Sequence, residues 1–330
     1  MTAYLVRRVL LMLLMLFLVT VAVFILFSLV PTDPARLTCG KSCTPEIIEA
    51  NRVRLGLDQP LYAQYWEFFK GLFVGRTYAE GTPVEFSCPA PALGYSFRNG
   101  ECVTTLIVAR LPVTIQLAIG AFLIWMVVGI LSGIFAALNR GKWQDRTLVG
   151  LSLVGYSFPT FFIGLTLLFF VVIKSGLLPY PDYVPPTEDP VQWFQTMILP
   201  WITVAVVYAA FYTRLTRTQM LETLGEDYIR TARAKGLHER TVIRKHAFRA
   251  GLTPLVTVAG LDFAGLLGGA VVTESIFQLP GLGRLAIESV TDYDLPIIVG
   301  TTLVFAFFVI VANLIVDLLY AAIDPRVRIA

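Results

Sequence analysis

Long runs of uncharged residues limit the possible folds of this chain more than any other feature of its sequence. A helix needs about 20 predominantly apolar residues to cross the hydrocarbon core of a bilayer. Six runs meet this requirement: residues 9–30, 111–139, 147–173, 190–213, 252–273 and 295–316, the last of which stays apolar past Asp317 as far as Ile323. Asp262 is the only charged residue in the six runs. They predict six membrane-spanning helices.

The composition supports a membrane protein and excludes two other classes. Of the 330 residues, 56% are hydrophobic and only 15% are charged, whereas about 25% of residues are charged in typical soluble domains. A soluble core cannot absorb this excess, and disordered chains are poor in apolar and aromatic residues. Strict alternation over about ten residues, the pattern of membrane β-barrels, is absent. We therefore predict an all-α polytopic membrane protein.

Two boundaries stay open at this point. Arg7 and Arg8 precede the first apolar run and would also fit a secretory signal peptide. The apolar region of a signal peptide usually has about 7–15 residues, and the first run is longer, so a retained helix is favoured. The fourth helix could begin anywhere between Val191 and Trp201.

Basic residues concentrate in every second connection between the predicted helices. The residues before the first run and those at 140–146 are basic, and residues 214–249 carry nine basic against four acidic side chains. The connections at 174–189 and 274–294 are acidic. Because cytoplasmic loops are enriched in Lys and Arg, both termini are predicted to be cytoplasmic.

All four cysteines lie in one predicted extracytoplasmic segment, and they are Cys39, Cys43, Cys88 and Cys102. This distribution is typical of disulfides in an oxidising compartment. Loop-closure entropy favours the nearest partners, so Cys39–Cys43 and Cys88–Cys102 are the preferred pairs among the possible connectivities. A metal site is the alternative, but the second closely spaced pair of cysteines that it would need is missing.

These observations divide the chain into three parts. Residues 1–30 form the N-terminal cytoplasmic end and the first helix, and residues 31–110 form an extracytoplasmic loop that contains the disulfides. Residues 111–330 form a five-helix core with a cytoplasmic loop at 214–251. The aromatic residues of the external loop, among them Trp66, are numerous enough for it to fold against the membrane part.

Asp262 is the candidate for a functional group inside the membrane. A charged side chain at the centre of a spanning helix costs roughly 2.5–3.5 kcal/mol on insertion scales, so it usually faces a cavity or a partner. We expect Asp262 to face a translocation pathway. The alternative is a packing contact with a neighbouring helix or subunit, and Gly265 and Gly268 nearby would permit close helix approach.

The connection between the fourth and fifth runs holds the most informative segment. Residues 226–237 predict a short helix with acidic residues in its first turn, which suits the helix dipole, and with Lys235 and Gly236 at its end. Tyr228 and Ala232 are four residues apart and would share a face that a partner could approach. A basic loop attracted to anionic lipid is the alternative. Nucleic-acid binding is not favoured, because an aromatic platform for bases is missing.

This segment also carries a resemblance to a known family. It resembles the cytoplasmic coupling motif of ABC importer permeases in the dipeptide, oligopeptide and nickel branch, and its residues are Tyr228, Ile229, Arg230, Thr231, Ala232, Arg233, Ala234, Lys235, Gly236 and Leu237. Further matches run through nearly the whole chain: Tyr4-Leu5-Val6-Arg7-Arg8, Leu55-Gly56-Leu57-Asp58-Gln59-Pro60-Leu61, Gly155-Tyr156-Ser157-Phe158-Pro159-Thr160-Phe161, Pro280-Gly281-Leu282-Gly283-Arg284 and Asp324-Pro325-Arg326. The chain is similar to the first of the two permease subunits of such systems. Residues 30–34, 75–78 and 83–102 depart from the family pattern.

The resemblance implies the type I ABC importer permease fold and a heteromeric importer in a bacterial plasma membrane. Its partners would be a second homologous permease, two ABC ATPase subunits and an extracytoplasmic substrate-binding protein. The cargo would be a dipeptide or oligopeptide, with nickel or another small solute as alternatives.

Catalysis is expected in the partners and not in this chain. ATP and Mg²⁺ would bind to the ATPase subunits, and this chain would need no cofactor, metal or catalytic residue. Gly40-Lys41-Ser42 resembles the end of a phosphate-binding loop but lacks the glycine that begins one. A stand-alone secondary transporter is the main rival, but internal repeats and several intramembrane ionisable groups, which it should have, are not found.

Overall fold

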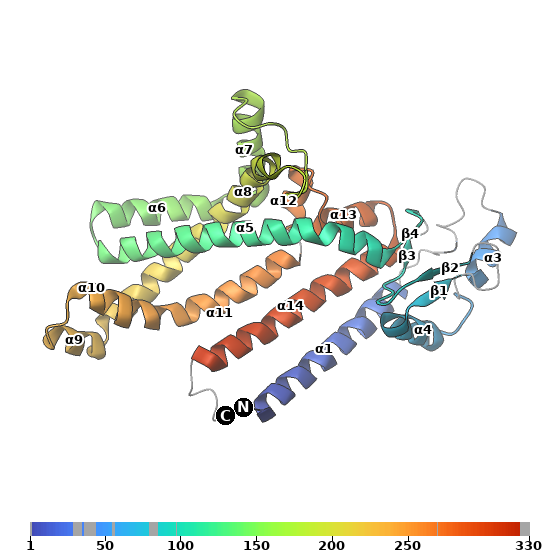
Figure 1. Cartoon of the computed structure of the whole chain (residues 1–330), viewed down its shortest axis with the longest axis horizontal. Helices are drawn as coiled ribbons and strands as arrows, with labels where there is room; N and C mark the ends of the chain where they lie inside the picture. The colour runs from blue at the N-terminus through green and yellow to red at the C-terminus, as the bar shows by residue number, and fades with distance from the viewer. Residues whose placement is uncertain are drawn as a thin grey trace.

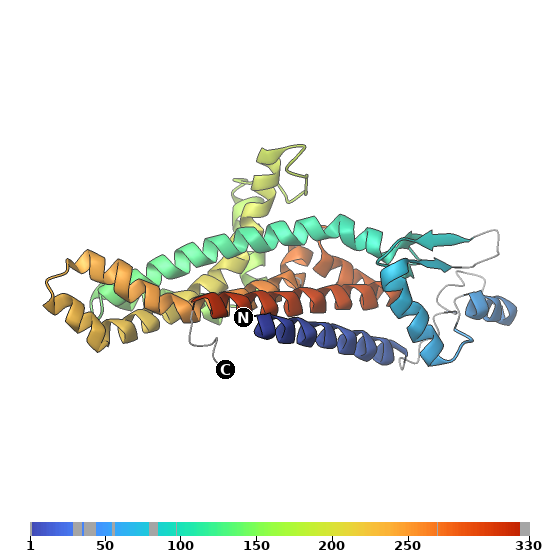
Figure 2. The ribbon, with the colours of Figure 1, turned by 60° about the horizontal axis from the view of Figure 1, so that its bottom comes forward.

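A computed structural model describes residues 2–28, 35, 44–54, 57–78, 85–96, 98–268 and 270–323. The molecule is an elongated bundle of long helices with two small strand pairs at one end (Figures 1 and 2). By length and composition, four of the described helices can cross a membrane alone, and six spans result if each of two bent helix pairs counts as one. The predicted all-α polytopic class is confirmed, and the predicted six spans require both bent pairs.

Two helices of 36 residues each, α5 (Val103–Leu138) and α8 (Pro190–Gly225), form the centre of the bundle. They approach closely because α5 presents glycines to α8. A Cβ on Gly129 would lie 2.6 Å from the Cβ of Tyr212, and one on Gly133 would lie 2.5 Å from the Cβ of Thr216. Such small residues allow helix backbones to pack tightly in a membrane. The buried core around this contact includes Leu117, Trp125, Met197, Tyr212 and Leu255.

The first and last helices, α1 (Thr2–Ser28) and α14 (Leu295–Ile323), lie side by side along one flank (Figures 1 and 2). Many side chains of α1 are exposed, including Leu10 at 60%. A helix that is apolar on all sides is typical of a membrane span. α1 packs along α14 and also contacts α4.

The third apolar run does not form one straight span. α6 (Trp143–Ser157) ends before Pro159, and α7 (Thr160–Leu167) continues as the π-helix η1 (Leu168–Lys174), so that the two halves are bent by 97°. Proline lacks an N–H and disfavours a helical conformation in the residue before it. Phe158 accordingly has an extended backbone, with ψ of 133°. As a result α7 projects away from the bundle (Figure 1).

The fourth uncharged run ends at residue 213, but the helix that it forms does not end there. α8 continues as a helix to Gly225. Its added turns pack on α6, where Nε of Arg217 lies 2.6 Å from Oδ1 of the buried Asp145. This ion pair and the buried Thr216, Met220 and Thr223 extend the core beyond the uncharged run.

Two other predicted helix ends also differ from the structure. α5 begins at Val103, inside the predicted external loop 31–110. α11 (Phe248–Leu267) ends before residue 273, and the chain then forms the short helix α12 (Val271–Ile276). An uncharged run shows only where charged residues are absent. It does not determine where the backbone hydrogen bonds of a helix end.

The end of the molecule that carries the strands is referred to below as the disulfide end. It consists of α3 (Pro45–Arg54), α4 (Leu61–Val74), β1 (Arg76–Tyr78), β2 (Phe86–Cys88), β3 (Tyr95–Ser96) and β4 (Glu101–Cys102), together with α13 (Leu282–Thr291) and α12, which extend it toward the middle of the molecule (Figure 1). β1 pairs with β2 and β3 pairs with β4, both antiparallel. α4 packs on α1, with ring centroids of Phe24 and Tyr65 5.4 Å apart and those of Phe17 and Phe69 5.8 Å apart. The described part of the segment at 31–110 therefore packs on the first predicted span.

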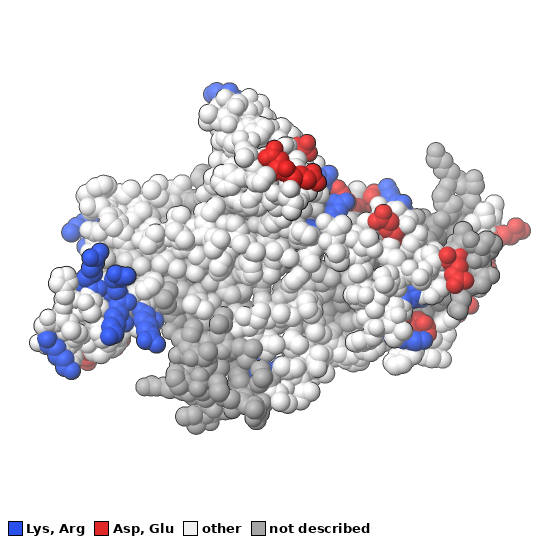
Figure 3. Space-filling model, viewed as in Figure 1, with Lys and Arg blue, Asp and Glu red and all other residues white. Residues whose placement is uncertain are grey.

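The opposite end, referred to below as the basic end, consists of α9 (Asp227–Ala234), α10 (Glu239–Thr241) and the π-helix η2 (Val242–Ala247), which leads into α11. In the view of Figure 3 the largest group of Lys and Arg side chains lies at this end, and most visible acidic side chains lie toward the other. The long axis of the molecule therefore separates basic from acidic connections, in the order that the sequence predicts.

Candidate functional site

The short helix α9 lies at the tip of the basic end, between α8 and η2 (Figure 1). Asp227 occupies its first turn, and the chain leaves the helix at Lys235. Gly236 follows with φ of 75°, a left-handed conformation that glycine adopts without steric cost. Its N–H donates a hydrogen bond of 2.9 Å to the carbonyl of Arg233. The structure thus contains the predicted short helix and its glycine end.

Two buried apolar side chains attach α9 to the rest of the chain. Ile229 is 0% exposed and Ala232 is 6% exposed. They pack in one cluster with Met220 of α8 and with Val242 and Ala247 of η2. Full burial of an isoleucine side chain contributes roughly 1.5–3 kcal/mol. A force on α9 would therefore be transmitted to both α8 and η2.

The expectation that Tyr228 and Ala232 together face a partner is wrong. Tyr228 is 45% exposed, but η2 and α8 cover Ala232. The spacing of the two residues places them on one side of the helix. It does not show which other segments of the chain pack against that side. Apart from Ile229 and Ala232, all residues of the predicted coupling segment 228–237 are exposed.

The outward surface of α9 carries two ion pairs. Arg230 lies 3.4 Å from Asp227, and Arg233 lies 2.7 Å from Glu239. The hydrogen bond to Glu239 raises the pKa of Arg233 above its ordinary value, and burial, followed by the charge of Glu226, raises the pKa of Tyr228. Exposed ion pairs of this kind contribute little to stability. Their charges are therefore available to a partner surface at low cost.

Asp262 lies on α11 and contacts α8. The hydroxyl of Tyr212 donates a hydrogen bond of 2.7 Å to its Oδ2. Beside this contact lies a cavity of about 300 Å³ lined by Tyr156, Val207, Tyr208, Phe211 and Asp262. Asp262 therefore contacts a neighbouring helix and also lines a cavity.

Sequence reasoning missed the role of Glu274, which it counted only among the acidic residues of a connection. Glu274 is 0% exposed, and its burial raises the pKa of its carboxyl group. Its Oε1 accepts a hydrogen bond of 2.8 Å from the hydroxyl of Thr114, and its Oε2 accepts one of 3.0 Å from the N–H of Arg284. Thr114 in turn accepts a hydrogen bond from the N–H of Leu282. One carboxylate therefore joins α5, α12 and the start of α13.

The sequence contains one signal for this site, namely the two glycines of the motif at residues 280–284. A Cβ on Gly281 would collide with the carboxyl group of Glu274, and a Cβ on Gly283 would lie 3.0 Å from its Oε2. Glycine is required at position 281 by the close approach of the buried Glu274 side chain, and at position 283 also by Val271, whose Cα would lie 2.7 Å from an added Cβ.

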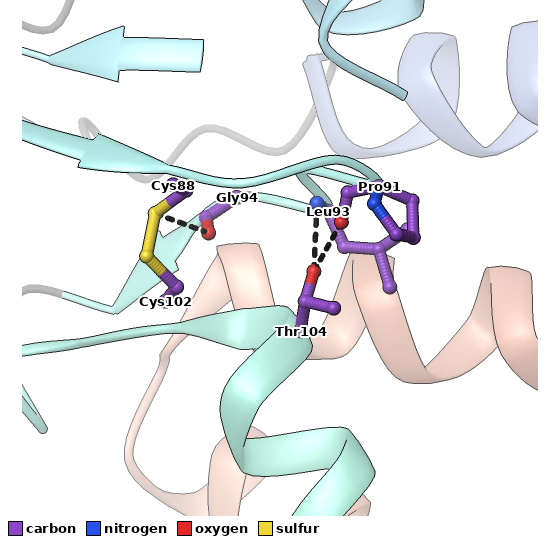
Figure 4. Close-up of a disulfide and its surroundings, with 6 residues drawn as sticks. All are labelled: Cys88, Pro91, Leu93, Gly94, Cys102 and Thr104. Carbon is purple, nitrogen blue, oxygen red and sulfur yellow. Dashed lines mark hydrogen bonds between the residues drawn. A yellow bond between two sulfur atoms is a disulfide. The ribbon is translucent and has the colours of Figure 1, made fainter. Parts of the chain in front are cut away.

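At the disulfide end the structure joins Cys88 of β2 to Cys102 of β4 (Figure 4). This bond links the two strand pairs directly before α5. Ser96 of β3 donates a hydrogen bond to the buried Asp294, and Arg98 forms an ion pair of 2.8 Å with Asp292. Cys39 and Cys43 lie outside the described residues. In the part of the chain that the structure describes, no group of three or more His, Cys, Asp or Glu side chains could hold a metal ion.

Comparison with known proteins assigns the chain to a family. Residues 129–329 match the family described as binding-protein-dependent transport system inner membrane component, and residues 1–118 match its N-terminal domain. A protein of Brucella abortus named as a peptide transport system permease is 40% identical over 328 residues, which cover 99% of each chain. The glutathione transport system permease protein GsiC of Escherichia coli K12 is 38% identical over 326 residues, or 98% of each chain.

The fold has a counterpart among solved structures. A chain of the MetNI methionine ABC transporter in an inward-facing conformation matches with a TM-score of 0.52 and 17% identity, covering 67% of this chain and 97% of that chain. At this identity the likeness shows the fold alone. The chain belongs to the binding-protein-dependent transport inner-membrane components and is a permease subunit of an ABC importer with the type I fold.

Proposed function

We propose that this chain imports short peptides and forms half of the translocation pathway, together with a second homologous permease subunit. Relatives that match almost its whole length carry names of peptide and glutathione transport permeases, and glutathione is itself a short peptide. These names support a peptide cargo over nickel or another small solute.

The remaining subunits bind at opposite ends of the molecule. Two ATPase subunits hold ATP and Mg²⁺ on the cytoplasmic side and hydrolyse the nucleotide. A substrate-binding protein delivers the cargo at the disulfide end. The accumulation of Lys and Arg at the basic end supports a cytoplasmic location of that end and of both termini.

The observation that carries the proposal is the position of α9. It protrudes at the basic end with eight of the ten residues at 228–237 exposed, while Ile229 and Ala232 fasten it to α8 and η2. In our proposal α9 sits on one ATPase subunit, and closure of the ATPases displaces α8 and α11 through this attachment. The permease would thus have two conformations, and nucleotide binding would favour one of them. In this proposal α9 couples ATP hydrolysis to transport, and Asp262 lies on the translocation pathway.

Substitution of Gly236 by valine tests the coupling role. Valine is strained at φ of 75°, so the end of α9 should be misdirected while the membrane spans still insert. We expect the purified complex with Gly236→Val to lose ATPase retention or solute-stimulated ATP hydrolysis, with wild-type amounts of permease in the membrane.

Gly176→Val is the matched control. Gly176 has φ of 63° and, like Gly236, has no atom within 4 Å of an added Cβ, but it lies in the connection after η1. A Gly236 variant with wild-type assembly, hydrolysis and transport would contradict the coupling role. So would equal losses in both variants, because they would point to a general effect of strain.

The cargo is tested separately. The complex is purified with its binding protein, and the bound solute is identified by mass spectrometry and metal analysis. A peptide is the expected result, and nickel without a peptide would contradict this part of the proposal.

A further inference from the structure

The half-open cavity beside Asp262 combines a carboxylate with aromatic rings on the wall of the helix bundle, where Tyr156 is exposed. It opens between three helices, because Tyr156 belongs to α6, Tyr208 and Phe211 belong to α8, and Asp262 belongs to α11. All three helices are parts of candidate membrane spans. The cavity is therefore placed where polar groups are expensive and usually functional.

The carboxylate of Asp262 has one hydrogen-bond donor in the described part of the chain. Tyr212 donates to Oδ2 at 2.7 Å, and the described residues contain no ion pair that includes Asp262. A carboxylate at membrane depth is stabilised when a cation or a further donor approaches it. Its position on the cavity wall gives such a group a place to bind.

The rings around the carboxylate suit a cation. Trp125 covers one face of Tyr208, with ring centroids 4.5 Å apart, so Tyr208 is held in place. The guanidinium carbon of Arg214 lies 5.4 Å from the ring centroid of Tyr156 and already occupies that ring, so Tyr208 is the lining tyrosine that is left for another cation. Positive groups within about 6 Å of an aromatic centroid are attracted by the ring, more strongly when water is excluded.

The size of the cavity limits what can enter. Its volume of about 300 Å³ is at the lower end of the range for ligand pockets, roughly 300–1,000 Å³. It can hold the end of a peptide but not an extended one.

We propose that this cavity receives the amino-terminal ammonium group of a peptide in transit, with Asp262 as counter-charge and Tyr208 in the lining beside it. The identity of the ligand rests on the peptide import proposed above. The chemistry of the cavity, recognition of an organic ammonium ion, does not depend on it.

The test measures cation binding directly on the complete importer in nanodiscs, without its binding protein. The probes are phenethylammonium and 2-phenylethanol, which have similar shapes and differ in charge. Saturation-transfer NMR titrations give the affinity of each probe for the wild type, Asp262→Asn and Asp182→Asn. Asp182 is an exposed aspartate outside the bundle and serves as the matched control.

We expect phenethylammonium to bind the wild type and the Asp182 variant equally and to bind Asp262→Asn roughly tenfold more weakly, since a charge-assisted contact is lost. 2-Phenylethanol should bind all three alike. A second variant, Tyr208→Leu, should also weaken the cation selectively while assembly stays intact.

Equal binding of phenethylammonium to the wild type and Asp262→Asn would overturn the proposal. So would no binding at all, which is the result expected if a basic residue of the second permease, or a proton, already neutralises Asp262. If the cavity binds ammonium selectively but the importer does not transport peptides, the proposed peptide cargo is contradicted and the proposed ammonium site is not.

Discussion

The two ends of the molecule are held together in different ways. At the disulfide end, a covalent bond, a fully buried glutamate and the hydrogen bond from Ser96 to Asp294 connect strands and helices that are distant in sequence. At the basic end, α9 is attached mainly by the side chains of Ile229 and Ala232, and its ion pairs are exposed. We therefore expect the first end to keep its shape and the second to shift as a unit against a partner.

Removal of the Glu274 carboxylate should have the largest effect on stability. Glu274→Ala leaves the hydroxyl of Thr114 and the N–H of Arg284 buried without their acceptor. Each unpaired buried group costs about 1–3 kcal/mol, so we expect a loss of about 4 kcal/mol in unfolding free energy. Thermal unfolding of the detergent-purified protein measures the change.

Glu288→Ala is the control for this variant, because Glu288 is partly exposed and pairs with the neighbouring Arg284. It should change the unfolding free energy by less than about 1 kcal/mol. Similar losses in both variants would show that burial does not make Glu274 special.

Loss of the disulfide should come next. Cys88 and Cys102 are 14 residues apart, and closing a loop of about 15 residues stabilises a fold by about 3 kcal/mol. We expect the double variant Cys88→Ser, Cys102→Ser to be digested faster within β1–β4, as followed by limited proteolysis and mass spectrometry. Ser87→Ala, at an exposed neighbouring position, should be digested like the wild type. If digestion of the double variant is also unchanged, the disulfide does not stabilise this end of the molecule.

Truncation of the α9 anchor should have an intermediate effect that stays local. Ile229→Ala removes most of a fully buried side chain, which typically costs about 2–5 kcal/mol, and we expect the lower end because the cluster is small. Hydrogen exchange should become faster in α9 and η2 and stay unchanged at the disulfide end. Tyr228→Ala, on the outward face, should leave exchange in the isolated permease unchanged, and equal effects of the two variants would contradict the assignment of inward and outward faces.

Removal of an exposed ion pair at the same helix should have the smallest effect. Arg233→Ala breaks the contact with Glu239, and exposed pairs of this kind are worth about 0.2–1 kcal/mol. The unfolding temperature should hardly change, while ATPase retention falls if Arg233 contacts the partner. A large loss of stability would show that the tip depends on its charges and not on its apolar anchor.

Several parts of the fold were predictable because they depend on local composition. The runs at 9–30 and 295–316 became α1 and α14, since a long apolar segment has few alternatives to a helix in a membrane. The short helix that ends at Gly236 was also predictable, because helix ends have local chemical signals. The candidate coupling segment was found in the same way, together with the resemblance to a family.

Local residue patterns were thus sufficient to predict the membrane class, the order of spans, the separation of basic from acidic connections and the family. The packing of the helices was needed to show that the third run bends by 97° at Pro159, that α8 continues past residue 213, and that Ala232 faces inward. It also decided that Glu274 is buried against Thr114, 160 positions away. Periodicity and charge describe neighbours along the chain, whereas burial depends on which distant helix covers a residue.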